Sequence, residues 1–353
     1  MCLAPKIAES STRWRFPTRA IAVAWGIAML AACAAAPATT NGTARIFDVN
    51  RQRYIDEATL VARLAATRYR LLGEIHDNPE HHALRARLVG ALTERGLHPA
   101  VVFEQFDLDH EAALAAAQTP GTDAETLADA GQFDRRGWRW PLHKPIVEAA
   151  LRAGLPIHAG NLSRAAIDAA ERSSQKPDAP WYARLRAARW SETQARKLRD
   201  EIADSHCGQL PASVVPRLAL AQRIRDAAMA QALVDDATAD GAILIAGNGH
   251  VRADLGVPVY LHAPKSPDAG PSSLSIGFVE VTPEEARQAD FPRGLADPGA
   301  FDYLWITTKA TRDDPCADFT MPAPAKSRRA RRAARRWSRE AEANRPRGAQ
   351  RGE

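Results

Sequence analysis

Several features that this 353-residue chain lacks limit what it can be. Its longest apolar run, residues 20–32, is shorter than the about 20 residues that span a bilayer comfortably. No internal repeat stands out along the sequence. Cysteine is scarce, with four in the whole chain. The hydrophobic content of 45% is ample for one large domain with a real core, or for two small ones.

The body of the chain lacks a net positive charge. The formal net charge is +5, but residues 326–353 hold 11 Lys/Arg against 3 Asp/Glu, and residues 1–33 hold 4 against 1. The part between them therefore carries a net charge of −6. An acidic body argues against a core that binds nucleic acid.

The N-terminus has the pattern of a secretory signal. Arginines at positions 13, 15 and 19 precede the apolar run, which ends in small residues. The final LAAC, Leu30–Cys33, resembles the bacterial lipobox, which implies cleavage before Cys33 and lipid on that residue. Residues 1–33 are therefore expected to be a lipoprotein signal peptide. The alternative is an ordinary signal peptide with an incidental cysteine.

The segments beside this anchor and at the far end are also expected to lie outside the folded body. Residues 34–43, rich in Ala, Pro and Thr, predict a tether. Ala34, rather than Asp, follows the cysteine, and by the sorting rule of enteric bacteria this favours the outer membrane, facing the periplasm. Residues 322–353 predict a basic disordered tail that touches anionic lipid or cell-wall polymers.

Two cysteines, Cys207 and Cys316, lie inside the body. In an oxidising periplasm they can pair, and closing so long a loop would add about 4–5 kcal/mol in the chain-entropy model. Separation in sequence says nothing about reach, so the disulfide is left open.

Strand-like and helix-like segments alternate over residues 44–315. Buried strands are predicted at 69–75 and 99–104, and a helix at 79–96 joins them, so the two strands should be parallel. The sequence predicts an α/β domain with a central, mostly parallel sheet flanked by helices. A long helical hairpin, 180–203 and 211–235, should lie over the sheet and its site. Further strands are predicted at 45–49, 155–159, 241–246, 257–261, 275–281 and 301–307.

The most informative stretch is LLGEIHDNPEHH, residues 71–82, directly after a predicted strand. Glu74 and His76, two residues apart, should point to the same side. Asn78 is suited to cap a helix that begins at Pro79. In open α/β sheets ligands bind at this strand-to-helix corner. The alternative is a polar turn with an ordinary capping asparagine.

Two other predicted strands end in the same kind of residue, Glu104 and His250. With Glu74 and His76 they would place two carboxylates and two imidazoles at one edge of the sheet. Such a set can bind a transition metal such as Zn or Mn, and it can equally perform acid–base catalysis.

Six spread motifs resemble the ChaN family of haem-binding lipoproteins, which is grouped with the Tiki-type metal-dependent proteases and the erythromycin esterases. The resemblance covers about residues 45–310 and implies an α/β fold, a lipid anchor, a role in iron uptake and haem as ligand. In the enzymatic relatives, the positions that match Glu74, His76, Glu104 and His250 carry the metal or the acid–base work. The motifs are LLGEIHDNPEHH (71–82), FEQF (103–106), WPLHKPIV (140–147), HCGQLP (206–211), AQRIRDAAMA (221–230) and GNGHVRADLGVP (247–258).

Haem needs flat apolar walls, an axial donor and cations for its propionates. ChaN-like sequences often carry tyrosine in the WPxYxP segment, where this chain has His143, which is also a competent ligand. Residues 135–144 supply all three, so they are predicted to form a pocket wall. The alternative is a surface loop with buried tryptophans. The candidates are Trp138, Trp140, Phe103, Phe106 and Phe133 for walls, His143, His76 and His250 for the donor, and Arg135, Arg136, Arg139 and Lys144 for the cations.

Two functions remain open at this point. The first is a membrane-anchored protein that binds haem, as a possible homodimer that closes over it. The second is a metal-dependent periplasmic hydrolase, esterase-like or protease-like, that uses Glu74, His76, Glu104 and His250. A structural lipoprotein with a decayed site is a weaker third, because all four acid–base residues are present.

Overall fold

The computed structural model describes residues 45–172, 177–261, 273–287, 292, 294–314 and 316–317. All of them belong to one unit of the chain, residues 41–353. The predicted signal segment with Cys33, the tether at 34–43 and the tail at 322–353 lie outside the described residues. Within the described part, no helix has the length and apolar character that crossing a bilayer requires.

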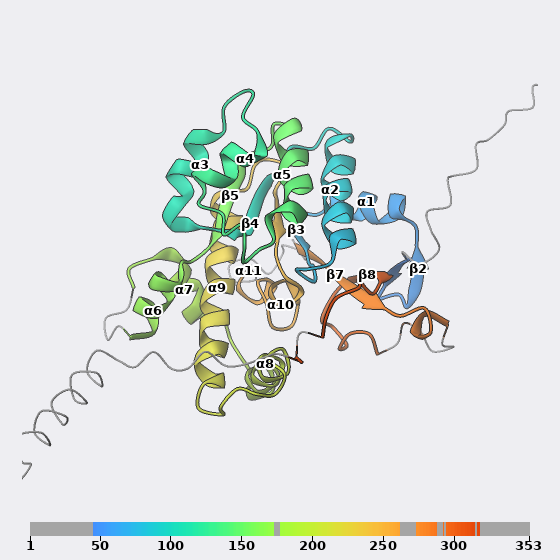
Figure 1. The fold of residues 1–353 in the computed structure, drawn as a ribbon, viewed down its shortest axis with the longest axis vertical. Coiled ribbons are helices and arrows are strands. Elements are labelled where there is room, and N and C mark those ends of the chain that lie inside the picture. The colour runs from blue at the N-terminus through green and yellow to red at the C-terminus, as the bar shows by residue number, and fades with distance from the viewer. Residues whose placement is uncertain are drawn as a thin grey trace, which may run out of the picture. The chain divides into compact units, whose positions relative to one another are not determined.

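A single eight-stranded sheet forms the centre of this unit, in the order β2-β1-β8-β7-β3-β6-β4-β5 (Figure 1). The six strands from β8 to β5 are parallel, and β1 pairs antiparallel with both β2 and β8. The predicted mostly parallel sheet is confirmed. The strands are β1 (Arg45–Asp48), β2 (Arg53–Ile55), β3 (Tyr69–Leu72), β4 (Ala100–Asp107), β5 (Ile157–Asn161), β6 (Ala242–Ile245), β7 (Ser273–Val281) and β8 (Tyr303–Thr308).

Helices cover both faces of the sheet, because successive strand residues point to opposite sides. Leu72 faces a core built with the first five helices, whereas Leu71 faces a core built with α9, α10 and α11. The first set is α1 (Glu57–Ala65), α2 (Pro79–Thr93), α3 (Glu111–Ala117), α4 (Ala124–Ala130) and α5 (Trp140–Arg152). The second set is α9 (Val215–Asp235), α10 (Asn248–Val251) and α11 (Pro258–Leu261). The remaining elements are the helices α6 (Arg164–Arg172), α7 (Pro180–Ala187) and α8 (Glu192–Asp204), and the short 3-10 helices η1 (Leu108–His110) and η2 (Glu285–Arg287).

The predicted helical hairpin is present, but its first arm is broken into α7 and α8. A new helix begins because Ser191 and Gln194 form a capping box, in which each side chain satisfies the backbone of the other residue. Helix α8 then carries Leu198 and Ile202 to the end of the sheet, where they line a cavity. The hairpin therefore lies over the site, as expected.

The predicted strand at 257–261 is wrong, because this segment is the short helix α11. Pro258 has no backbone N–H to give to a sheet and suits the first turn of a helix. The backbone N–H groups of Tyr260 and Leu261 instead bond to the carbonyl of Val257. Tyr260 is buried by this turn, which explains the apolar pattern.

Candidate functional site

The first part of the site lies just past the end of β3. A Cβ added at Gly73 would lie 2.3 Å from Asn248 Oδ1 and 2.8 Å from the Ile276 carbonyl, so only glycine fits there. Glu74, which follows, is buried, and its Oε1 accepts a hydrogen bond from His76 Nδ1 at 2.7 Å. The proton on Nδ1 leaves Nε2 of His76 as the nitrogen with the lone pair. The His76 side chain is 49% exposed.

Arg85 of α2 balances the charge of Glu74 inside the protein. Its Nη2 forms an ion pair with Glu74 Oε2, and neither side chain is exposed. The same Nη2 donates to Nδ1 of His82 at 2.9 Å, while His82 Nε2 donates to the His76 carbonyl at 3.0 Å. Burial lowers the pKa of Arg85 to about 9, which still leaves the guanidinium charged at neutral pH. The Glu74 carboxylate is thus fixed by helix α2.

A second cluster joins Glu104 of β4, His250 of α10 and Asp226 of α9. His250 Nε2 lies 3.1 Å from Glu104 Oε1, and His250 Nδ1 lies 2.6 Å from Asp226 Oδ1. The other oxygen of Glu104 accepts the backbone N–H of Gly247 at 2.7 Å. Burial alone would lower the pKa of His250, but the two carboxylates outweigh it and raise the pKa to about 10. Burial likewise opposes the charge of Glu104, yet His250 lowers its pKa to about 2.

The two clusters meet at a cavity of about 320 Å³. Glu74, His76 and His250 line it, together with Leu198 and Ile202 of α8. A Cβ at Gly247 would lie 2.9 Å from His76 Nε2 and 3.7 Å from Glu104 Oε2, so these two side chains lie beside each other across that glycine. The structure therefore brings all four predicted residues to one edge of the sheet.

Most of the predicted wall at residues 135–144 faces elsewhere. Helix α5 begins at Trp140, inside the predicted wall, and this turns His143 into the core, where it is fully buried. Trp140 Nε1 and Lys144 Nζ both contact Glu125, at 2.9 and 3.0 Å from Oε1. These three residues do not line the cavity, which corrects the predicted wall.

Trp138 and Arg139 are the members of that segment that lie beside the site. The Trp138 ring packs edge-on against His76, with centroids 4.9 Å apart. Arg139, whose side chain is 61% exposed, lies 3.7 Å from Asp77 through Nη1 and Oδ2. The Phe103, Phe106 and Phe133 rings belong to the core.

The predicted metal ligands do not form a metal site in the described part of the chain. The group there whose ligand atoms all lie within 4.8 Å of one another is Glu74, His82 and His143, which shares only Glu74 with the predicted set. The guanidinium of Arg85 already contacts both Glu74 and His82. Both ring nitrogens of His250 face carboxylates. These residues do not fit a bare divalent cation.

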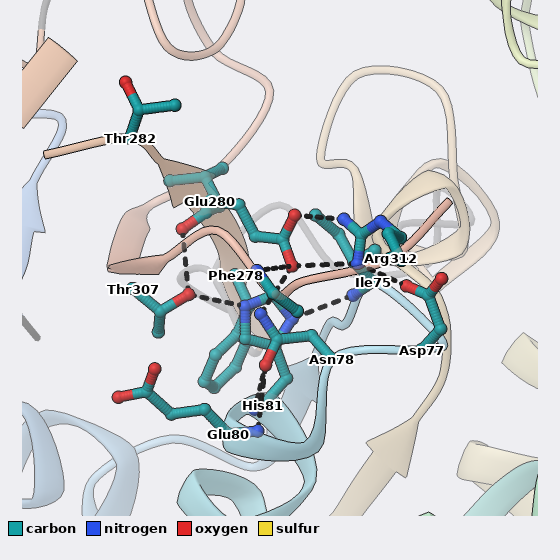
Figure 2. A network of polar contacts seen from close by, with 12 residues as sticks. Ile75, Asp77, Asn78, Glu80, His81, Phe278, Glu280, Thr282, Thr307 and Arg312 are labelled. Carbon is teal, nitrogen blue, oxygen red and sulfur yellow. Dashed lines mark hydrogen bonds and ion pairs between the residues drawn. The ribbon is translucent and has the colours of Figure 1, made fainter. Parts of the chain in front are cut away.

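A separate network holds the loop that follows Glu74 (Figure 2). Arg312 Nη1 donates to Asp77 Oδ1 at 2.6 Å and to Glu280 Oε1 at 3.1 Å. Asn78 Nδ2 also donates to Glu280, at 2.5 Å, while its Oδ1 accepts from the Glu80 N–H as the cap of α2. Asn78 is thus the predicted cap, and it is also tied to β7.

The family model described as "Haem-binding uptake, Tiki superfamily, ChaN" matches residues 60–261, more than half of the sequence. The chain belongs to this family. No curated protein matches it.

Three solved structures are similar to this ChaN-family chain to different degrees. A structure titled for cofacial heme binding to ChaN of Campylobacter jejuni matches with a TM-score of 0.59 and 21% identity, over 75% of this chain and 97% of that one. The type III effector HopBA1 has a TM-score of 0.39 and 15% identity, over 71% and 93%. A mutant of erythromycin esterase EreC in its open conformation has a TM-score of 0.35 and 15% identity, over 76% and 84%. Only the first carries weight, and at that identity it shows the fold.

Sequence reasoning missed two buried charges of this ChaN-family site, Arg85 and Asp226. Each had a signal in the sequence. Arg85 lies three residues after His82, so the two share a helix face. Asp226 is a single carboxylate among the alanines of AQRIRDAAMA. Only the packing of α2 and α9 against the sheet reveals what each one contacts.

Proposed function

We propose that this chain binds haem through Nε2 of His76 as the axial ligand. The observation that carries the proposal is the hydrogen bond of His76 Nδ1 to Glu74, which leaves Nε2 free on a half-exposed ring. The two other candidate histidines are less suited. His143 is fully buried, and His250 faces a carboxylate at each ring nitrogen.

A carboxylate on the far nitrogen is the arrangement that orients a ligating histidine and strengthens it as a donor. Histidine is a common axial ligand of haem iron. Trp138 beside the ring supplies an apolar wall, and the exposed Arg139 supplies a cation for a propionate. The cavity of about 320 Å³ is at the small end for ligand pockets and is partly polar. Haem would therefore lie across its mouth, which a second subunit of a homodimer would cover.

We further propose that a lipid on Cys33 anchors the chain in the cell envelope, at the outer membrane and facing the periplasm. The signal pattern and the LAAC sequence support it. The basic tail, residues 322–353, would add adhesion to anionic lipid or cell-wall polymers. The family description names haem-binding uptake, and a role in iron uptake would follow from it.

A hemin titration of the mature chain, followed by the Soret band, tests the proposal. We expect His76→Ala to weaken hemin binding by at least about tenfold and to shift the Soret band. His98→Ala is the matched control, because His98 is exposed and precedes β4 at the opposite edge of the sheet. Arg139→Gln should cost a smaller, salt-dependent share of the affinity. Unchanged hemin binding in His76→Ala would overturn the assignment.

A second candidate function, hydrolysis, rests on the same Glu74–His76 pair. A histidine that is oriented by a carboxylate and opens on a cavity is the arrangement of a general base, and Glu104 lies beside it. Glu104→Gln separates the two functions. It should abolish turnover of a model ester if the chain is a hydrolase, whereas hemin binding through His76 should persist and weaken by no more than about tenfold.

A further inference from the structure

Asp226 lies in the AQRIRDAAMA motif, on the face of α9 that packs against the sheet. It is fully buried, and the four residues that follow it, 227–230, are buried too. A carboxylate in such surroundings is costly unless it is paired. Its single hydrogen-bonded partner among the described residues is His250, with Asp226 Oδ1 lying 2.6 Å from Nδ1.

His250 connects Asp226 to Glu104, which lies near the cavity. Its other nitrogen, Nε2, lies 3.1 Å from Glu104 Oε1, so a carboxylate faces each ring nitrogen. Ionised carboxylates only accept hydrogen bonds, so the ring must carry a proton on both nitrogens to satisfy them. Glu104 is fixed in turn through Oε2 by the N–H of Gly247, the residue across which it neighbours His76.

We propose that Asp226 is a positioning residue that holds His250 as an imidazolium and thereby keeps Glu104 ionised and oriented beside His76. Asp226 does not line the cavity, so it acts through His250. The proposal deepens the haem site described above and rests on it for its consequence, although the state of His250 is independent of any ligand.

The surrounding charges agree with this role. The groups that face the Asp226–His250 pair are Glu104 of β4, His76 after β3, Arg225 and Gln222 of α9, and Tyr260 of α11. Burial raises the pKa of Asp226 to about 6 even with His250 beside it. Each member of the pair is therefore kept ionised by the opposite charge of the other. If either one is replaced, the neutral form of the remaining residue becomes more favourable.

The direct test is an NMR titration of the imidazole nitrogens of the ligand-free protein. In the wild type we expect His250 to remain an imidazolium from pH 6 to pH 9. In Asp226→Asn the amide can no longer accept the Nδ1 proton as a carboxylate does, so His250 should lose its charge within that range. A neutral wild-type His250 at pH 7.5 would overturn the proposal without any variant, as would an Asp226→Asn protein that keeps the imidazolium.

Asp235→Asn is the matched control on the same helix, since Asp235 accepts an exposed hydrogen bond from Gln231 and does not line the cavity. It should leave the His250 signals unchanged. Hemin titration then measures the consequence, and we expect Asp226→Asn to weaken binding by about threefold to tenfold with an altered pH profile, which a purely structural role would not produce. If the wild type fails to bind hemin, the haem proposal falls while the NMR result still decides the role of Asp226.

Discussion

Arg85 and Glu74 form an ion pair that is completely shielded from solvent. The same guanidinium donates to Nδ1 of His82, so one cation of α2 serves a carboxylate and an imidazole together. Burying a pair of charges is weak evidence of stability by itself, but removing one partner leaves the other uncompensated. The ionised state of Glu74, on which the orientation of His76 depends, is therefore supplied by Arg85.

Replacing Arg85 with methionine should destabilise the fold strongly. Glu74 would keep a buried charge with no cation, and we expect the free energy of unfolding to fall by about 3–5 kcal/mol. Urea denaturation followed by circular dichroism measures the loss.

Arg87→Met, two residues along the same helix, is the control. Arg87 pairs with Glu57 at 2.7 Å through an exposed contact and lies over the Trp305 ring. Surface contacts of this kind contribute about 1 kcal/mol or less. Equal losses in the two variants would show that burial of the Arg85 pair does not matter.

His81 should make stability depend on pH. It is fully buried, its Nδ1 accepts the Ile75 N–H at 3.0 Å, and its Nε2 bonds to Thr307 (Figure 2). Burial lowers its pKa to about 3, from an ordinary value near 6.5. Below about pH 6.5 the imidazole of His81 binds a proton in the unfolded chain but not in the folded one. The stability of the fold is therefore unaffected by this group above that pH, and it decreases as the pH falls from 6.5 toward 3.

His81→Asn removes this titration and should flatten the pH dependence of the unfolding free energy below pH 6.5, by up to about 1.4 kcal/mol per pH unit. Thermal melts at several pH values measure it. His98→Asn, at an exposed position, should leave the slope unchanged. A wild-type slope retained in His81→Asn would contradict the assignment.

The sequence predicted what depends on local pattern. The apolar runs of β3, β4 and β6 end at Glu74, at Glu104 and at the glycines before His250, and this pattern predicted where each strand ends. Parallel strands bring such polar ends together at one edge of the sheet. The cap at Asn78 followed from the proline after it.

What the sequence could not give depends on the packing of distant elements. The start of α5 at Trp140 turned His143 inward, although the residue types of 135–144 suited a surface pocket. Arg85 and Asp226 find Glu74 and His250 only once the helices have docked. The link from Arg312 to Glu280 joins the C-terminal segment to β7, and no sequence pattern marks it.

Cys207 and Cys316 form a disulfide across a sequence separation of 109 residues. It ties the turn after α8 to the segment that carries Arg312. Reduction should lower the free energy of unfolding by about 2–5 kcal/mol. Hydrogen exchange should then rise first in residues 309–314 and in α8. Cys316→Ser should reproduce the effect in the absence of reductant, and a variant as stable as the oxidised wild type would argue against the bond.

Gly73→Ala tests whether the corner after β3 is built around a missing side chain. The new Cβ would meet Asn248 Oδ1 at 2.3 Å and the Ile276 carbonyl at 2.8 Å, and Asn248 is itself bonded to the Phe278 backbone at 2.6 and 3.0 Å. We expect a loss of about 1–3 kcal/mol and weaker hemin binding, because the Glu74–His76 turn must move. Gly90→Ala in α2, where a Cβ meets nothing within 4 Å, should instead stabilise the protein by about 0.5–1 kcal/mol. Chemical denaturation of the two variants gives opposite signs if the corner is as tight as the distances indicate, and the same sign if Asn248 can simply turn away.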